Sequence, residues 1–444
     1  MTSPVAGQRW VVVGAGSGGC VVARRLVDAG ASVVLVESGP DLAPGAVPAG
    51  ISGDDCFAAM TPDRVHGDLL ATRVAGGAST VYLRGRGVGG SSAVNAMVGL
   101  HCDRELYAAW NWPELADFES RVLVPTAEAD DAELGPVDRA LMAASSDATK
   151  VALTRRDGRR VTSAEAYLWP ILGSDRFELR CDTVVDRLEL LDDRVVTGAR
   201  LADGQVIEAD RVALCAGAIH TPTILLRSSS CPSLTGFGLA DHAAAAISLL
   251  LAEPGAEMGL AVATVVDRDP IQILPMNHLG TDRRGLGLLM VSLMRPHSAS
   301  GRVRLASNDP LDAPIVEFDL LSDQRDVAIL REGVRQALRL LASAPMHDIV
   351  REAFIDDVGT TVAALDTDAD IDDWLRRRGA DYVHASGTCA AGSVVDANGA
   401  VIGLSGVTIA DASVFPSIPN VNTHLPTMAV AEMLVDRWIR SNDG

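Results

Sequence analysis

The chain has 444 residues, of which 48% are hydrophobic and 22% charged, a composition typical of a folded protein with two or three domains. Its 38 lysines and arginines against 58 aspartates and glutamates give a formal net charge of −20. So acidic a chain lacks the basic surface that binds nucleic acids or anionic membranes, and we expect neither partner.

The seven cysteines are scattered, and none belongs to a CxxC pair. Such a set argues against a disulfide framework and a zinc site, so we expect no metal centre and a reducing compartment. The first ten residues lack a basic segment followed by an apolar stretch, and no apolar run approaches the ~20 residues that span a bilayer. The sequence therefore predicts a cytoplasmic protein without a signal peptide or transmembrane segment.

Strand and helix patterns alternate at the start of the chain. Residues 9–13 form a short apolar run, residues 20–26 have helical spacing, and residues 32–37 form a second apolar run that ends in an acid. This order indicates a parallel sheet. Residues 75–99 are rich in glycine and serine, but the apolar residues among them predict an ordered loop rather than a linker.

The middle of the chain has a different pattern. Residues 177–214 predict a meander of short strands that leads into a helix at about residue 221, and residues 243–320 alternate as antiparallel strands do. Helical periodicity returns at 326–343 and at 427–439. We therefore predict an α/β fold with a Rossmann-like nucleotide domain and a second, α+β domain built on an antiparallel sheet.

A glycine fingerprint lies between the first strand and the first helix. Gly14, Gly16 and Gly19 match GxGxxG, and Glu37 ends the next strand. The glycines permit a tight turn and a close backbone approach to a pyrophosphate, which the helix N-terminus stabilises, and the carboxylate can accept hydrogen bonds from a ribose. The fingerprint predicts a dinucleotide site without choosing between FAD and NAD.

Four further stretches, together with the fingerprint, resemble the glucose–methanol–choline (GMC) family of FAD-dependent oxidoreductases. They are GRGVGGSSAVN from Gly85, GAIHTPTILLRS from Gly217, GFGLADH from Gly236, and a C-terminal block of HASGTC from His384, ADAS from Ala410 and PSIPNVNTHLPT from Pro416. The chain departs from the family at Ser229, where a glycine is usual, at Ala390 and Ala391, where Arg-Met is usual, and in a shortened region 96–180. The shortening leaves the cover of the active site and the substrate unpredicted.

The resemblance implies FAD as the cofactor. The residues implied to contact it are Gly14, Gly16, Ser17, Gly19, Glu37, Gly89, Gly90, Ser91, Asn95, Met97, Val185, Asp411, Ala412, Thr423 and His424. Val94 stands where members with a histidyl link carry the histidine, so we expect FAD to be held without a covalent bond. The single GxGxxG is then assigned to FAD, and we expect no turnover with NAD(P).

Because these motifs occur at both ends and in the middle of the chain, the segments that bear them must meet in space. We predict a discontinuous FAD-binding domain of residues 5–115, 175–240 and 375–444. Residues 116–174 and 241–374 would form the substrate-binding domain.

The catalytic positions of the family fall on His384 and Asn422. A neutral imidazole can take the proton of an alcohol O–H near neutral pH, while an amide donor orients the alcohol oxygen and the flavin accepts the hydride. We expect the rate of flavin reduction to rise through an apparent pKa near neutrality. For His242 we expect a structural role, with its ring bonded to a nearby loop.

The function indicated is oxidation of a small-molecule alcohol by hydride transfer to FAD. The chain resembles choline dehydrogenases among other members, and oxygen, a quinone or another carrier such as mycofactocin remains open as the electron acceptor. The alternative is a non-redox lyase of the same fold, similar to hydroxynitrile lyases, which keeps FAD and the histidine but transfers no hydride.

Overall fold

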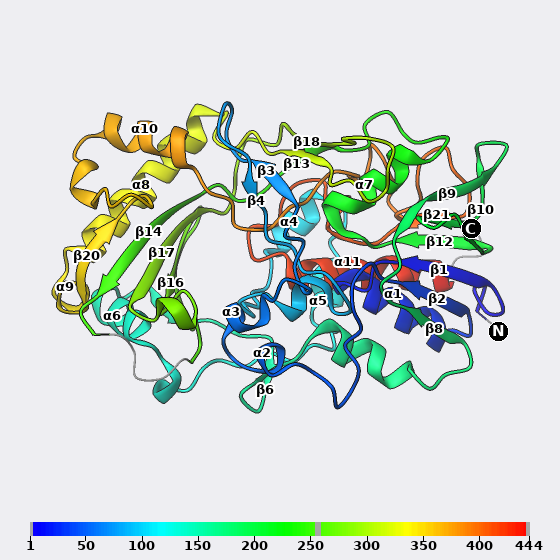
Figure 1. Ribbon diagram of the computed structural model, residues 1–444, viewed down its shortest axis with the longest axis horizontal. Helices are drawn as coiled ribbons and strands as arrows, with labels where there is room; N and C mark the ends of the chain where they lie inside the picture. The colour runs from blue at the N-terminus through cyan, green and yellow to red at the C-terminus, as the bar shows by residue number, and fades with distance from the viewer. Residues whose placement is uncertain (1–2, 254–258, 441–444) are drawn as a thin grey trace.

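The computed structural model describes residues 3–253 and 259–440. A parallel sheet lies toward one end of its long axis and an antiparallel sheet toward the other (Figure 1). The parallel sheet has the order β21-β12-β1-β2-β8, so it draws its strands from three distant parts of the chain. Its strands are β1 (Arg9–Val13), β2 (Ser32–Val36), β8 (Phe177–Arg180), β12 (Arg211–Leu214) and β21 (Val407–Ile409).

Two long helices pack beside the parallel sheet and against each other: α1 (Ser17–Asp28) and α11 (His424–Arg440). The rings of Trp10 and Trp438 stack at 5.8 Å and join strand β1 to helix α11. Arg25 of α1 forms a bidentate ion pair with Glu432 of α11, with nitrogen–oxygen distances of 2.7 and 2.9 Å. These contacts fix helix α11 against strand β1 and helix α1.

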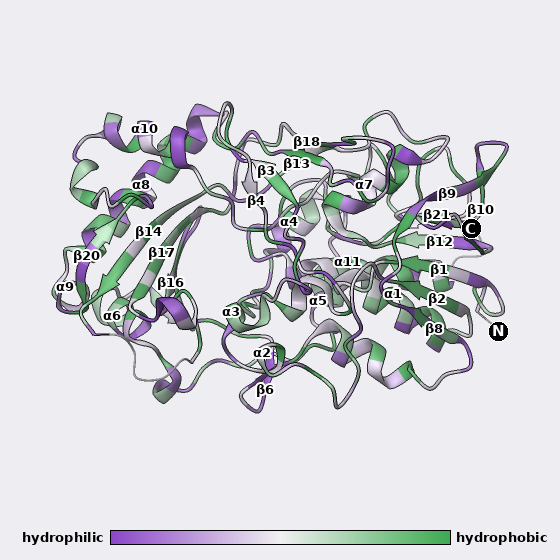
Figure 2. Ribbon diagram, viewed as in Figure 1, coloured by the Kyte–Doolittle hydropathy of each residue, from purple (hydrophilic) through white to green (hydrophobic). Residues whose placement is uncertain are grey.

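The antiparallel sheet has six strands in the order β20-β14-β17-β16-β15-β5. Figure 2 shows β14 and β17 as largely hydrophobic ribbons, which fits strands that are covered by other elements. The strands are β5 (Ala148–Lys150), β14 (Ala244–Leu251), β15 (Thr264–Arg268), β16 (Ile271–Met276), β17 (Leu286–Leu293) and β20 (Val350–Phe354). Its neighbouring helices are α6 (Pro136–Ala144), α8 (Gln324–Leu341), α9 (Ala344–Ile349) and α10 (Asp368–Arg378).

Smaller sheets connect the two ends. One has the order β13-β18-β19-β3-β4, another the order β11-β10-β9, and β6 pairs with β7. Their strands are β3 (Leu70–Thr72), β4 (Thr80–Val81), β6 (Arg155–Arg156), β7 (Arg159–Arg160), β9 (Val185–Leu191), β10 (Val195–Leu201), β11 (Val206–Glu208), β13 (Phe237–Leu239), β18 (Gly301–Arg304) and β19 (Ile315–Glu317). The remaining α-helices are α2 (Ala49–Ser52), α3 (Cys56–Ala59), α4 (Arg104–Ala109), α5 (Leu115–Glu119) and α7 (Gly217–Arg227). Because β3 pairs with β19, hydrogen bonds cross the division between the two predicted domains, which stays a prediction.

The predicted fold class is confirmed, and two local expectations are corrected. Strand β8 does not belong to the predicted meander; it pairs in parallel with β2, because the backbone of Val33 to Val36 offers it a free edge. Helix α7 begins at Gly217, before the predicted residue 221, since the carboxylate of Asp411 accepts the N–H of Gly217 at 2.8 Å and caps the helix start. No helix within the described residues is both long and apolar enough to cross a bilayer.

Candidate active site

A large cavity of about 860 Å³ is lined by residues from the glycine fingerprint, the loop from Gly85, the stretch from Gly217 and the C-terminal block. This volume lies in the range of small-molecule and cofactor sites. Both catalytic candidates, His384 and Asn422, line it. The predicted cofactor residues that line it are Gly14, Gly16, Ser17, Glu37, Gly90, Ser91, Asn95, Val185, Asp411, Ala412, Thr423 and His424. The segments that bear these motifs therefore meet around one cavity.

Three predicted contact residues lie behind the cavity wall instead. A Cβ on Gly19 would come within 1.8 Å of the Gly14 carbonyl, so this glycine permits close packing of helix on strand. The N–H of Gly89 donates to the carbonyl of Ala15 at 2.8 Å, which docks one glycine loop on the other. Met97 is buried in an apolar cluster. These residues shape the wall from behind, and their contact with the cofactor stays a prediction.

The N-terminus of α1 is built to receive an anion. Its N-cap, Gly16, supplies no side-chain hydrogen bond, so the first N–H groups of the helix lack that partner. A Cβ on Gly16 would find no atom nearer than 4.0 Å, at the Cα of Gly90, so the protein itself leaves space there. Free N–H groups, the helix dipole and a bare backbone suit a pyrophosphate.

Glu37 joins the loops around the nucleotide end. One carboxylate oxygen accepts the N–H of Ala15 at 2.8 Å, and the other accepts the N–H groups of Gly39 and Gly87, each at 3.0 Å. The side chain is buried and lines the cavity. Glu37 thus has a structural task in addition to the predicted ribose contact, because it holds the fingerprint loop against the second glycine loop.

Asp411 joins the C-terminal block to helix α7. Its carboxylate accepts the N–H of Gly217 at 2.8 Å and the hydroxyl of Thr221 at 2.6 Å on one oxygen, and the N–H of Ser413 at 2.8 Å on the other. Burial raises the pKa of Asp411, while these donors act against the rise. The carboxylate therefore organises two loops that face the cavity.

Two buried polar atoms at the cavity have no partner among the described residues: Oδ1 of Asn422 and Nε2 of His424. His424 is fixed by its other nitrogen, which lies 2.9 Å from the hydroxyl of Ser17, and burial lowers its pKa to about 4. Buried polar atoms of this kind call for a ligand. With the glycine-lined anion site at one end and an amide and imidazole at the other, the cavity fits an FAD.

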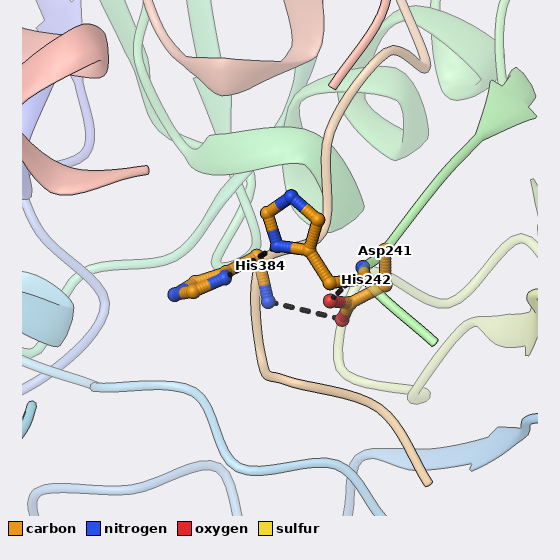
Figure 3. A group of neighbouring side chains, drawn as sticks. All are labelled: Asp241, His242 and His384. Carbon is orange, nitrogen blue, oxygen red and sulfur yellow. Dashed lines mark hydrogen bonds between the residues drawn. The ribbon is translucent and has the colours of Figure 1, made fainter. Parts of the chain in front are cut away.

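The catalytic candidates lie side by side. Nδ2 of Asn422 is 3.5 Å from Nε2 of His384, and the ring of Tyr382 lies 4.7 Å from that of His384. Figure 3 shows His384 and His242 with their Nδ1 atoms turned toward each other, and these atoms are 2.9 Å apart. Burial lowers the pKa of both imidazoles, that of His242 to about 4, so both are neutral near pH 7.

The hydrogen bonds of His242 decide which nitrogen of His384 is basic. Nε2 of His242 lies 2.8 Å from the carbonyl oxygen of Pro419, which can only accept, so Nε2 carries the proton. The neutral ring of His242 then presents an unprotonated Nδ1, to which Nδ1–H of His384 donates. His384 therefore directs the lone pair of its Nε2 toward Asn422. The expected bond between His242 and a nearby loop is also present.

The buried carboxylate of Asp241 fixes the backbone of both histidines. Its carboxylate accepts the Tyr82 hydroxyl at 2.6 Å and the N–H groups of His242 and His384 at 2.7 and 2.9 Å. Ligand atoms of Asp241, His242 and His384 lie within 4.8 Å of one another, a spacing that also suits a metal ion. These atoms already have hydrogen-bond partners: the Asp241 carboxylate accepts N–H and O–H donors, the two imidazoles bond to each other, and Nε2 of His242 donates to the Pro419 carbonyl, so the hydrogen bonds account for the cluster.

The sequence did not reveal the opposite side of the cavity. Six apolar residues, from α3 and the residue after it and from β16 and β17, line it: Phe57, Met60, Leu274, Met276, Leu288 and Met290. These residue types are common in any core, and only the strand alternation of β16 and β17 gave a signal, without saying which face meets a ligand. Tyr382 was also missed, although it lies two residues before His384.

Comparisons with known proteins agree with this geometry. Two family models, both described as GMC oxidoreductase, match residues 111–244 and 296–431. A GMC-type oxidoreductase of Rhodococcus erythropolis is 27% identical over 95% of this chain and 96% of its own length. The 5-(hydroxymethyl)furfural oxidase of a Methylovorus species is 29% identical, but the match spans only 52% of this chain and 50% of that protein. A pyranose dehydrogenase of Leucoagaricus meleagris is 36% identical over 33% of this chain and 24% of its own length.

Solved structures share the whole fold. Pyridoxine 4-oxidase from Mesorbium loti superposes with a TM-score of 0.86 at 22% identity, over 97% of this chain and 99% of that one. Formate oxidase superposes with a TM-score of 0.83 at 20% identity, over 98% of each chain. At these sequence identities the superpositions establish only the fold.

The fold and the cavity define a flavin-dependent oxidoreductase in which segments from both ends and the middle of the chain line one cavity. The chain belongs to the GMC oxidoreductase family, and FAD is the cofactor of this family. The relatives act on CH–OH groups of alcohols and sugars.

Proposed function

We propose that the protein oxidises an alcohol by transferring a hydride to bound FAD, with His384 as the base and Asn422 as the donor that fixes the alcohol oxygen. The observation that carries this proposal is the lone pair of His384 Nε2, held 3.5 Å from the amide nitrogen of Asn422 at the cavity. A base and a neutral donor side by side are what removal of an O–H proton requires.

The residues that would hold FAD follow from the cavity wall. The N–H groups at the start of α1, beside Gly16, would take the pyrophosphate, and the loop of Gly90 and Ser91 would flank it. Ala412, Thr423 and the unpartnered Nε2 of His424 would face the ring end. When bound, FAD supplies the acceptor for the hydride from the alcohol carbon.

His384 and Asn422 divide the proton chemistry. The amide N–H of Asn422 donates to the alcohol oxygen and turns its O–H toward Nε2 of His384, which takes the proton. The imidazolium that forms keeps its Nδ1–H bond to His242, so part of the new charge is stabilised by the lone pair of that ring. The carboxylate of Asp241 holds the backbone of both histidines while this occurs.

Anaerobic mixing of the FAD-loaded protein with a panel of alcohols tests the proposal. Loss of the flavin absorbance with at least one alcohol supports it. A lyase of the same fold would leave the flavin oxidised with every alcohol while cleaving its own substrate, and that result would contradict it. Admission of oxygen afterwards separates an oxidase, which recovers its colour quickly, from a dehydrogenase that needs a quinone or another carrier.

We also propose that FAD is held without a covalent bond. Val94 lines the cavity and offers no nucleophile. Cys56 and Cys215 line it too, but burial raises the pKa of Cys56 to about 11 and that of Cys215 well above its usual value, so both stay protonated and unreactive. Acid precipitation should release yellow flavin into the supernatant; flavin in the pellet would contradict this. All seven cysteines are unpaired, which supports the cytoplasm as the proposed location.

A further inference from the structure

The cavity has a second wall that no nucleotide motif occupies. Leu274 and Met276 of β16 stand directly opposite Met290 and Leu288 of β17, so the four side chains form two cross-strand pairs on one face of the antiparallel sheet. Phe57 and Met60, from α3 and the residue after it, line the cavity with them. We call these six residues the apolar wall.

The apolar wall continues to the catalytic histidine through Tyr382. The ring of Tyr382 packs in the same cluster as Met276 and Met290 and lies 4.7 Å from the ring of His384. Its hydroxyl donates to the side-chain oxygen of Gln272 at 3.0 Å and is therefore already paired. A molecule whose hydroxyl meets His384 would have its carbon skeleton directed along an apolar surface.

No member of the apolar wall carries a charge or a strong hydrogen-bonding group. Two charged residues line the cavity near His384: Asp381 forms an ion pair with Arg73, while Arg84 donates to the carbonyl of Val383 at 2.6 Å and keeps its positive charge. A cationic head group at the apolar wall would lose its water without a counter-charge, and the many hydroxyls of a sugar would lose their hydrogen bonds.

We propose that the substrate is a neutral, hydrophobic alcohol, whose alkyl or aryl part lies against the apolar wall. This inference rests on the proposed function of the same site. Three of the six residues, Met60, Met276 and Met290, are methionines, and their flexible thioethers can adapt to chains or rings of different shape. Cationic alcohols and sugars are therefore excluded as preferred substrates.

The sharpest test compares choline with its neutral carbon isostere, 3,3-dimethylbutan-1-ol, in anaerobic reduction of the FAD-loaded protein. The two differ only in charge, and the isostere should be favoured by about 100-fold or more in kcat/KM. Straight-chain alcohols should gain about fourfold per added methylene until the wall is covered. A preference for choline or glucose would overturn the inference and leave the proposed function intact, whereas an unchanged flavin with every alcohol would contradict the proposed function.

A binding experiment decides the point without turnover. Tertiary alcohols have no transferable hydride on the carbinol carbon, so 2-methylhexan-2-ol should bind to the FAD-loaded protein in a calorimetric titration. Met290→Gln should weaken that binding about tenfold, because an amide replaces a thioether against the alkyl chain. Met142→Gln, at an exposed methionine of α6, is the matched control and should change nothing. Equal affinities for Met290→Gln, Met142→Gln and the unmodified protein would overturn the inference.

Discussion

The two walls of the cavity are built by different means. The wall formed by the fingerprint loop from Gly14 and the glycine loop from Gly85, which we call the nucleotide wall, consists mainly of backbone at positions where a side chain would collide. A Cβ on Gly18 would lie 2.1 Å from the Ala410 carbonyl, and one on Gly90 would lie 2.7 Å from the Cα of Gly16. The apolar wall consists of side chains on regular strands and one short helix. The first wall tolerates few substitutions, and the second can change its residues while keeping its backbone.

The comparison separates what the family shares from what the chain alone determines. A wall of backbone N–H groups recognises phosphates in any chain that can make the turn. A wall of side chains recognises whatever fits its surface, so family membership leaves the substrate open. His384 and Asn422 lie where the walls meet, and substitutions on each side should therefore give different kinds of failure.

The largest effect should come from the residue at the junction. His384→Ala removes the proton acceptor, and we expect flavin reduction to slow by about 10²–10⁴-fold while FAD stays bound, since the nucleotide wall is untouched. Rapid-mixing spectroscopy measures the rate. His347→Ala, at an exposed histidine of α9, is the control. If the His384→Ala protein kept its FAD and reduced it at more than about a third of the unmodified rate, the catalytic role would be wrong.

Asn422→Ala should cost less. It removes one donor to the alcohol oxygen, an effect of about 10–10³-fold on flavin reduction by analogy with the loss of an oxyanion donor. The same rapid-mixing experiment applies, with Asn398→Ala at an exposed loop as the control. A larger loss than that of His384→Ala would reverse the assigned roles.

The contrast between the walls also explains which parts of the site could be predicted from the sequence. Glycines such as Gly14 and Gly90, which adopt positive φ and approach other backbone closely, leave a pattern that can be recognised without coordinates. Leu274 and Met290 leave none, because the same residues on the same strands would suit a buried core. The hydrogen bond between His242 and His384 joins residues 142 positions apart, and only the folded chain brings them together. The short strands could be predicted because, like the glycine loops, they leave a local pattern in the sequence. The pairing of β8 with β2 could not, because it depends on tertiary structure.

Two glycine substitutions should disturb the nucleotide wall in ways that an experiment can distinguish. Gly19→Ala forces a Cβ to 1.8 Å from the Gly14 carbonyl, so the turn itself must move. Gly16→Ala meets no protein atom nearer than 4.0 Å but projects into the space assigned to the pyrophosphate. We expect Gly16→Ala to keep the melting temperature of the apoprotein and to bind FAD about 5–150-fold more weakly, as overpacking by one methyl would cause.

Fluorescence titration of the apoprotein with FAD measures this affinity. Gly173→Ala is the matched control, because a Cβ there meets nothing within 4 Å. Normal FAD affinity of the Gly16→Ala protein would contradict the placement of the pyrophosphate at the N-terminus of α1.

His242 offers a smaller and more selective test. His242→Asn can place an oxygen near the former Nδ1 and keep an acceptor for His384, whereas His242→Gln can keep the donor to the Pro419 carbonyl and lose that acceptor. A net hydrogen bond of about 0.5–1.5 kcal/mol corresponds to a slowing of about 2–10-fold, which should be larger for the Gln variant. Equal rates for the two variants would contradict control of the His384 tautomer by His242.

The pH dependence should be the mildest effect near neutrality, and it revises the expectation from sequence. Burial and the positive charge of Arg84 both disfavour the imidazolium, so the pKa of His384 lies well below the usual 6.5. A base is active when unprotonated. Titration of His384 itself should therefore change the rate of flavin reduction by less than about twofold between pH 6.5 and 9 and lower it only at more acidic pH, in contrast to a rise through neutrality. Asp241, whose pKa burial raises to about 7, is the neighbouring group that titrates within this range.

Stopped-flow reduction at saturating alcohol across this range measures the profile. The positive charge of Arg84 allows a second test of the pH profile. Arg84→Met removes a cation from the surroundings of His384, so the imidazolium becomes less unfavourable and the midpoint of the profile should move to higher pH. Arg24→Met, on the exposed side of α1, is the control and should leave the midpoint in place. A midpoint at or above 6.5 in the unmodified protein, or one that moves to lower pH in Arg84→Met, would show that the residue responsible for the titration is not the buried imidazole of His384.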